Sequence, residues 1–249
     1  MRAVFQTDIG KIRAHNEDSG GVFQNKDGHY LAVVADGMGG HLAGDVASEM
    51  TISYLKQQWE QSEHISSPAV AEQWLKDHVA AVNRILFEHS LQHEECQGMG
   101  TTIVSAICTD QFATVGHIGD SRCYLFNKNG FQQITEDHSL VNELVKKGQI
   151  SKEDAEHHPR KNVLLRALGT EREVKLDMKT VSIDEHDMLL LCSDGLSNKV
   201  SEEMMLHILN SDDPLEHKAQ ALIDLANERG GEDNITLVII DFSLECESR

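Results

Sequence analysis

The chain has 249 residues, enough for one large domain with a well-buried core. Acidic residues outnumber basic ones 41 to 22, which gives a formal net charge of −19. Such a charge disfavours non-specific binding to nucleic acid or to an anionic membrane surface, and it suits the binding of cations.

The cysteines point to a reducing compartment. They are odd in number, widely spaced and form no Cys-x-x-Cys pair: Cys96, Cys108, Cys123, Cys192 and Cys246. The first residues contain no apolar signal region, and the longest apolar runs, such as 31–35, are far too short to cross a bilayer. We therefore expect a cytoplasmic protein, and by default a monomer.

In chain order, runs rich in Val, Ile, Thr and Leu predict strands, several of them apolar enough to be buried on both faces. These runs are 30–36, 101–108, 112–120, 123–126, 174–183, 187–194 and 235–242. Apolar residues at helical spacing predict amphipathic helices over 43–54, 71–86 and 215–226, with a loop over 62–68. Because strands and helices each cluster, the order favours a layered α+β domain over regular βαβ alternation.

A polar insert from about 139 to 166 interrupts the later strands and reads as helical. Ser139 and Asn142 fit the start of a helix, and Ser151 to Asp154, "SKED", resembles a capping box. Arg160 and Lys161 within it could contact an acidic or phosphorylated substrate, or simply belong to a mobile surface loop.

Aspartates mark the ends of four predicted strands. Asp36, Asp120 and Asp194 each follow an apolar run, and Asp233 comes just before the last one. Strand ends can converge at one edge of a sheet, where short carboxylates form an oxygen-lined cavity that favours Mg²⁺ or Mn²⁺ over zinc. The alternative is that the four aspartates are unrelated turn or capping residues. It is weakened because all four have Gly, Ser or Asn beside them.

Two further stretches attract attention. "VVADGMGG", residues 33–40, places three glycines after one aspartate, although an Asp-Gly hairpin turn would need fewer. "KIRAHNED", residues 11–18, places Arg13 close to Glu17 and Asp18. Arginine suits bidentate capture of a phosphate, so this stretch could recognise phosphate beside a metal centre; taken alone, however, it is better explained as an exposed loop of mixed charge.

Together, these motifs resemble the metal-dependent PPM/PP2C protein serine/threonine phosphatases in their compact bacterial form. The matching segments run in order from Thr7 to Ile240: "TDIGKIRAHNEDS", "VVADGMGGHLAGDVAS", "GMGTTIVSA", "GHIGDSR", "TEDHSLVNELVKKGQIS", "HPRKNVLLRALG", "LLLCSDGLSN" and "GGEDNITLVII". The resemblance implies an α+β fold, a four-layer α-β-β-α sandwich of two antiparallel sheets flanked by helix pairs. It also implies one domain over 1–249, with a flap insert at about 137–166 beside the active site.

The resemblance further implies the metal ligands. Asp36 would bridge two metals, with the Gly37 carbonyl as a further ligand, and Asp194 and Asp233 would bind one of these metals. Asp120, with Asp194, matches the pair that holds a third, weaker metal in bacterial members. The cofactors would be two or three Mn²⁺ or Mg²⁺ ions. The later glycines of the opening motif, 39 and 40, would let the chain pass close to the metals without a Cβ in the way.

The remaining roles concern the substrate. Arg13 would grip the substrate phosphate, while Glu17 and Asp18 would bind metal-coordinated water. Eukaryotic members have a histidine as suspected general acid where this chain has Met38, so His41 and a metal-bound water are both candidates for the acid.

The implied reaction is hydrolysis of phosphoserine and phosphothreonine in proteins by a water that bridges two divalent cations, without a covalent intermediate. The partners would be phosphoprotein substrates and a cognate serine/threonine kinase whose marks the enzyme removes. One alternative is a catalytically inactive relative that binds phosphoproteins; it would be expected to have lost one of Asp36, Asp194 and Asp233, and all three are present. Another is a phosphatase acting on small metabolites with the same core chemistry.

Overall fold

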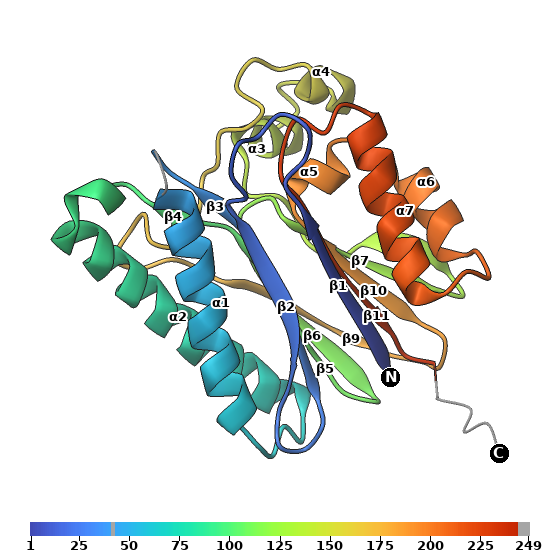
Figure 1. The fold of residues 1–249 in the computed structure, drawn as a ribbon. Helices are drawn as coiled ribbons and strands as arrows, with labels where there is room; N and C mark the ends of the chain where they lie inside the picture. Colours follow the sequence, from blue (N-terminus) through green and yellow to red (C-terminus); the bar gives the residue numbers. More distant parts are fainter. Residues whose placement is uncertain (41–42, 244–249) are drawn as a thin grey trace.

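Two antiparallel β-sheets pack face to face in the computed structural model, which describes residues 1–40 and 43–243 (Figure 1). The strand order of the first sheet is β1 (Arg2–Asp8), β11 (Ile235–Asp241), β10 (Met188–Cys192), β7 (Arg122–Asn127) and β8 (Gly130–Gln133). The order of the second is β2 (Asp18–Gln24), β3 (Tyr30–Met38), β5 (Ile103–Cys108), β6 (Phe112–Ile118) and β9 (Asp177–Ser182). The short β4 (Gly100–Thr101) pairs with the end of β3.

Helices cover the outer face of each sheet. The long helices α1 (Ala43–Gln61) and α2 (Pro68–Gln92) pack on the second sheet, and a 3₁₀ turn, η1 (Glu94–Cys96), follows them. The first sheet is covered by α5 (Asp194–Ser197), α6 (Glu202–Leu209) and α7 (Leu215–Glu228). The four layers are thus helix, sheet, sheet and helix, which confirms the predicted sandwich (Figure 1).

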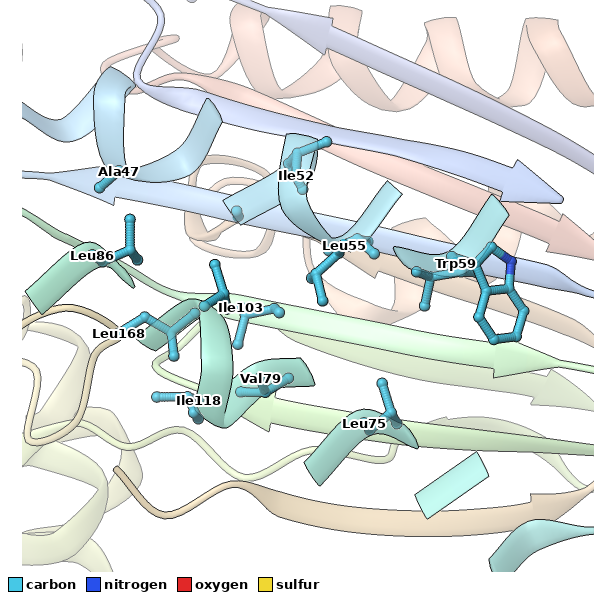
Figure 2. Close-up of a cluster of buried hydrophobic side chains, with 14 of the residues drawn as sticks. Ala47, Ile52, Leu55, Trp59, Leu75, Val79, Leu86, Ile103, Ile118 and Leu168 are labelled. Carbon is cyan, nitrogen blue, oxygen red and sulfur yellow. The ribbon is translucent and has the colours of Figure 1, made fainter. Parts of the chain in front are cut away.

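Side-chain alternation explains why the strands are buried on both faces. In β3, Leu31, Val33 and Ala35 pack with α1 and α2, whereas Ala32 and Val34 point between the two sheets. Figure 2 shows the first of these clusters, in which Trp59 and Leu75 from the two helices meet the sheet. A third cluster joins the first sheet to α6 and α7. Burial of these faces fixes the register of the strands, and with it the position of their ends.

The predicted elements all form, but the prediction missed others. The strands β1, β2 and β8 and the helices α5 and α6 were not expected. The insert (residues 137–166) forms α3 (Leu140–Lys146) and α4 (Lys152–Glu156) outside both sheets. Ser139 caps α3 by accepting a hydrogen bond from the Asn142 amide at 3.3 Å, and Ser151 caps α4 in the predicted capping box.

Two structural observations concern the predictions about the cysteines and about membrane-spanning segments. Cys96, Cys108, Cys123 and Cys192 are buried free thiols, while Cys246 lies outside the described residues. Across the part of the chain that the structure describes, no helix has both the length and the apolar character needed to traverse a bilayer.

Candidate active site

Carboxylates gather at one end of the sandwich, where β3 and β10 end and β2 and β11 begin. Asp18 lies directly opposite Asp36 in the register of β2 and β3. The pKa of Asp36 is raised well above its usual value, first because of burial and then because of four neighbouring negative charges, those of Asp18, Asp194, Asp120 and Asp233. The four predicted aspartates are therefore brought together with Asp18 in one electrostatic cluster, which we call the carboxylate cluster.

Two threonines from the β4–β5 segment fix the backbone of Asp36. The Asp36 amide donates to the Thr102 hydroxyl at 3.0 Å, and the Asp36 carbonyl accepts from the Thr102 amide at 2.8 Å and the Thr101 hydroxyl at 2.9 Å. Both threonines are buried. These bonds hold Asp36 through its main chain and do not involve its carboxylate.

Thr102 also contacts the turn that carries Asp120. The hydroxyls of Thr102 and Ser121 lie 2.7 Å apart, and both side chains are buried. Burial is the largest cause that raises the pKa of Asp120 to about 7, followed by the charge of Asp194. The strand ends that bear Asp36 and Asp120 are thus tied by one buried pair of hydroxyls. The sequence analysis did not predict this pair, although Thr102 lies in the quoted segment "GMGTTIVSA" and Ser121 in "GHIGDSR".

Asp18 is the most enclosed member of the carboxylate cluster, with 8% of its surface exposed. Its Oδ2 accepts a hydrogen bond from the Ser193 hydroxyl at 2.7 Å. Burial raises its pKa to about 7 even though hydrogen bonds from Ser193 and Thr236 oppose the shift. Ser193 itself bonds across to Thr236, accepting from its amide at 3.0 Å. The predicted role of Asp18 in binding a metal-coordinated water stays a prediction.

Arg13 is half-exposed and pairs with two predicted site residues. Its Nη2 lies 2.7 Å from Asp233 Oδ1, and its Nη1 lies 3.5 Å from Glu17 Oε2. Burial lowers the pKa of Arg13, but Asp233 outweighs this effect and the net pKa is raised, so the guanidinium stays charged. Asn234 holds the supporting loop, since its Oδ1 accepts from the Glu17 amide at 2.8 Å and its Nδ2 donates to the His15 carbonyl at 3.0 Å.

Within "VVADGMGG", the close approach of neighbouring backbone requires a glycine at position 37. A Cβ on Gly37 would lie 2.1 Å from the Gly44 carbonyl oxygen and 2.5 Å from that of Glu17. A Cβ on Gly40, in contrast, would meet no described atom within 4 Å, and on Gly39 it would approach Ala43 at 3.0 Å. Gly37 is therefore the residue that lets α1 approach the end of β3, and the expected role of Gly39 and Gly40 beside the metals stays a prediction.

The insert reaches the Asp233 side of the site. Arg160 and Lys161 are exposed. The pKa of Glu232, which precedes Asp233, is lowered first by its hydrogen bond and charge pairing with Lys199 and further by the charge of Lys161. Lys161 is therefore near enough to act electrostatically on this loop. His41, the candidate general acid, lies outside the described residues.

The potential ligand atoms at this end of the sandwich are mostly carboxylate oxygens, which suit hard divalent cations. Within residues 1–40 and 43–243, however, no three acidic, histidine or cysteine side chains are arranged as a ready-made metal site. Protein groups hold the carboxylates instead: Arg13 binds Asp233, and Asn198 donates to Asp194 at 3.0 Å. Asp233 is thus already paired with Arg13, and the predicted ligand set stays a prediction.

The raised pKa values predict an unusual pH dependence without divalent cations. Asp18 and Asp120 keep their protons to about pH 7 in the folded chain but lose them near 3.8 when unfolded. Between these values the folded state binds more protons, so the free energy of unfolding falls as pH rises, by on the order of 1 kcal/mol per pH unit for each group. Urea unfolding in chelator should therefore show lower stability at pH 8 than at pH 5.

Added Mg²⁺ should reverse this trend, because a cation stabilises the ionised carboxylates of the folded state. The Asp120→Asn variant, which is neutral at both pH values, serves as the control and should show a flatter pH dependence than the parent. Equal slopes for the parent and the variant would contradict the prediction.

Comparison with known proteins agrees with this geometry. Residues 11–231 match the family model described as protein phosphatase 2C. The chain is 48% identical over 249 residues to a serine/threonine phosphatase of Listeria welshimeri, covering 100% of this chain and 99% of the relative. Among solved structures, the serine/threonine phosphatase Stp1 of Staphylococcus aureus superposes with a TM-score of 0.92 at 37% identity, covering 98% of this chain and 94% of that one.

A second solved structure is the catalytic domain of the serine/threonine protein phosphatase PstP in complex with two manganese ions. It superposes with a TM-score of 0.85 at 35% identity, covering 96% of this chain and 97% of that one. A family model that spans most of the chain and full-length relatives at this identity lead to one conclusion: the chain belongs to the protein phosphatase 2C family of serine/threonine phosphatases.

Proposed function

We propose that the chain hydrolyses phosphoserine and phosphothreonine in proteins with the help of divalent cations. The observation that supports this most is the carboxylate cluster, in which burial and mutual repulsion raise the pKa of Asp36, beside a charged and half-exposed Arg13. Carboxylates in such a cluster repel one another unless protons or cations intervene. Bound cations would therefore be strongly favoured at working pH.

Within this proposal, Asp36, Asp194 and Asp233 hold two Mg²⁺ or Mn²⁺ ions, and Asp120 with Asp194 holds a third, weaker one. The PstP relative with two manganese ions supports the number two. Bound divalent cations lower the pKa of a water and offset charge on the phosphoryl oxygens.

Arg13 binds the substrate phosphate in this proposal. Its guanidinium already pairs with the carboxylates of Asp233 and Glu17, and the same planar fork suits two oxygens of a phosphate. Cations that neutralise these carboxylates would release the guanidinium for the substrate. His41 remains the proposed donor of a proton to the departing serine or threonine oxygen, with a water as the alternative.

The proposal extends to the insert and to the partners. Residues 1–249 form a single phosphatase domain, and the insert acts as a flap whose Lys161 lies on the substrate side of the site. The substrates are phosphoproteins, and a serine/threonine kinase adds the phosphate groups that the enzyme removes.

The inactive phosphoprotein-binding alternative is not favoured, because the relatives are named as phosphatases and Asp36, Asp194 and Asp233 are all present. A phosphatase of small metabolites would differ only in the groove around the same chemistry.

The test is release of inorganic phosphate from a phosphothreonine peptide by metal-stripped protein, with and without Mn²⁺ or Mg²⁺. We expect turnover only with added cation and none from Asp194→Asn. A matched control is Asp110→Asn, which changes an exposed aspartate in the β5–β6 turn at the other end of the sheet. Absence of turnover from folded, metal-loaded protein would support the phosphoprotein-binding alternative, and turnover of small phosphate esters alone would support the metabolite alternative.

A further inference from the structure

The loop between β1 and β2 carries an exposed isoleucine directly beside Arg13. This loop lies at the end of the sandwich that holds the carboxylate cluster (Figure 1). Ile12 is 70% exposed, and Ile9 in the same loop is 39% exposed. Single exposed apolar side chains are common on protein surfaces, but two of the six large ones that the described residues expose lie in this one loop. Apolar surface therefore adjoins the guanidinium that pairs with Asp233 and Glu17.

The backbone of Ile12 is held by the loop that precedes β11. The Gly231 carbonyl accepts hydrogen bonds from the amides of Lys11 and Ile12, at 2.7 and 3.2 Å. Arg13, the next residue, pairs with Asp233 of the same loop at 2.7 Å. The backbone of Ile12 and the guanidinium of Arg13 are therefore both anchored on one short segment.

The upstream part of the β1–β2 loop packs on the same segment. The Ile9 carbonyl accepts from Asn234 Nδ2 at 2.9 Å, and the Gly10 amide donates to Asp8 Oδ1 at 2.8 Å. Gly10 has a φ of +80°, and a Cβ there would overlap the Asp233 carbonyl oxygen. Such a close approach of two backbones leaves the loop little room to move.

The side chain of Ile12 takes no part in this support. The hydrogen bond to Gly231 comes from a main-chain atom, and Ile12 belongs to none of the three hydrophobic clusters that the described residues form. Its apolar surface is thus available to a partner. Because the loop is already ordered, binding to that surface costs little conformational entropy.

We propose that Ile12 determines specificity by binding an apolar side chain of the substrate, within two residues of the phosphorylated serine or threonine. The inference rests on the proposed function, in which Arg13 binds the phosphate. Since Ile12 and Arg13 are consecutive, their side chains reach only a short segment of an extended peptide, in which each residue spans about 3.3 Å. Contact between the two apolar surfaces removes both from water and so favours such substrates.

The test compares five phosphothreonine peptides at saturating Mn²⁺. One contains only serine and asparagine around the phosphothreonine, and each of the others has a single leucine, at position −2, −1, +1 or +2. For the parent protein, we expect at least one leucine peptide to exceed the polar peptide about tenfold in kcat/KM, which corresponds to about 1.4 kcal/mol. Partial burial of one apolar side chain produces an effect of this size.

Ile12→Ser should reduce this ratio to about one, whereas Ile12→Val should keep most of it. Serine retains the main-chain bond to Gly231 and removes the apolar surface. If the substitution instead displaced Arg13, kcat/KM would fall for all five peptides together and the ratio would stay near tenfold. The ratio therefore separates a contact with the substrate from a structural role of the loop.

Val70→Ser is the matched control, because it also replaces an exposed β-branched apolar residue with serine. Val70 is 39% exposed and lies in the first turn of α2. The loop before this helix bonds to the β2–β3 hairpin, at the other end of the second sheet, through the Lys26 amide and the Ser62 carbonyl at 3.3 Å. Val70→Ser should keep the parental ratio.

Three results would overturn the inference: equal kcat/KM for all five peptides in the parent, a preference retained in Ile12→Ser, or a preference lost in Val70→Ser as well. In each of these cases, turnover of the peptides still supports the proposed function. If the folded, Mn²⁺-loaded parent releases phosphate from none of them, the proposed function itself fails, and the inference fails with it.

Discussion

Asp36→Asn is expected to abolish phosphate release while leaving the fold intact. The substitution removes the central negative charge of the carboxylate cluster but changes the side-chain volume very little. Bound cations supply several kcal/mol of transition-state stabilisation, so their loss corresponds to a decrease in turnover of roughly a thousandfold or more. The measurement is turnover of a phosphothreonine peptide at saturating Mn²⁺, with the bound Mn²⁺ determined by calorimetry.

The fold should survive because Asp36 is held through its backbone. Its amide and carbonyl bond to Thr102 and Thr101, and these bonds do not involve the carboxylate. Burial and its neighbours raise the pKa of Asp36 and so favour the neutral form without cations. Asparagine is permanently neutral, and we expect the unfolding midpoint in chelator to equal or exceed that of the parent.

Asp110→Asn again provides the matched control and should retain parental turnover. If Asp36→Asn keeps turnover and cation binding, Asp36 is not a ligand and the proposed centre is wrong. If it unfolds in chelator, its role is structural and the backbone argument fails.

Strands buried on both faces could be predicted from the sequence alone. In β3, the continuous apolar residues from Leu31 to Ala35 contribute to two hydrophobic cores. Asp36, the polar residue that follows this run, lies at the site. The same logic located Asp120 and Asp194 at the ends of β6 and β10, where the structure brings their charges together. Apolar runs are informative here because the sandwich buries its inner strands completely.

The missed strands are the edges of the sheets. β1 and β2 lie at the edges of the first and second sheet, and β8 at the other edge of the first. Each is largely half-buried, with polar residues or glycines among the apolar ones. Edge strands have one unpaired side, so their sequences lack the continuous apolar run on which the prediction depended.

Pairings within the site also escaped prediction, for a different reason. Arg13 meets Asp233 across 220 positions of sequence, and Ser193 meets Asp18 across 175. Such contacts depend on how the two sheets are stacked, which local patterns do not encode. The resemblance suggested which residues belong to the site, but only the tertiary structure shows that Arg13 pairs with Asp233.

Gly37→Ala is expected to destabilise the fold strongly, because it adds a methyl group where two backbone segments meet beside the site. The new Cβ would lie 2.1 Å from the Gly44 carbonyl oxygen, in the first turn of α1, and 2.5 Å from the Glu17 carbonyl oxygen. Both are backbone atoms, so relief requires moving α1 or the β1–β2 loop away from β3. Overpacking of this kind costs about 3 kcal/mol of unfolding free energy, which corresponds to a decrease in melting temperature of roughly 10 °C for a chain of this size.

Gly40→Ala is the matched control, because it adds the same methyl group three residues later, where no described atom lies within 4 Å. It should change the free energy of unfolding by less than about 0.5 kcal/mol. Thermal unfolding of both variants in chelator measures the difference without any contribution from cations. Equal stability of the two variants would contradict the prediction, because it would show that α1 and β3 can separate at little cost.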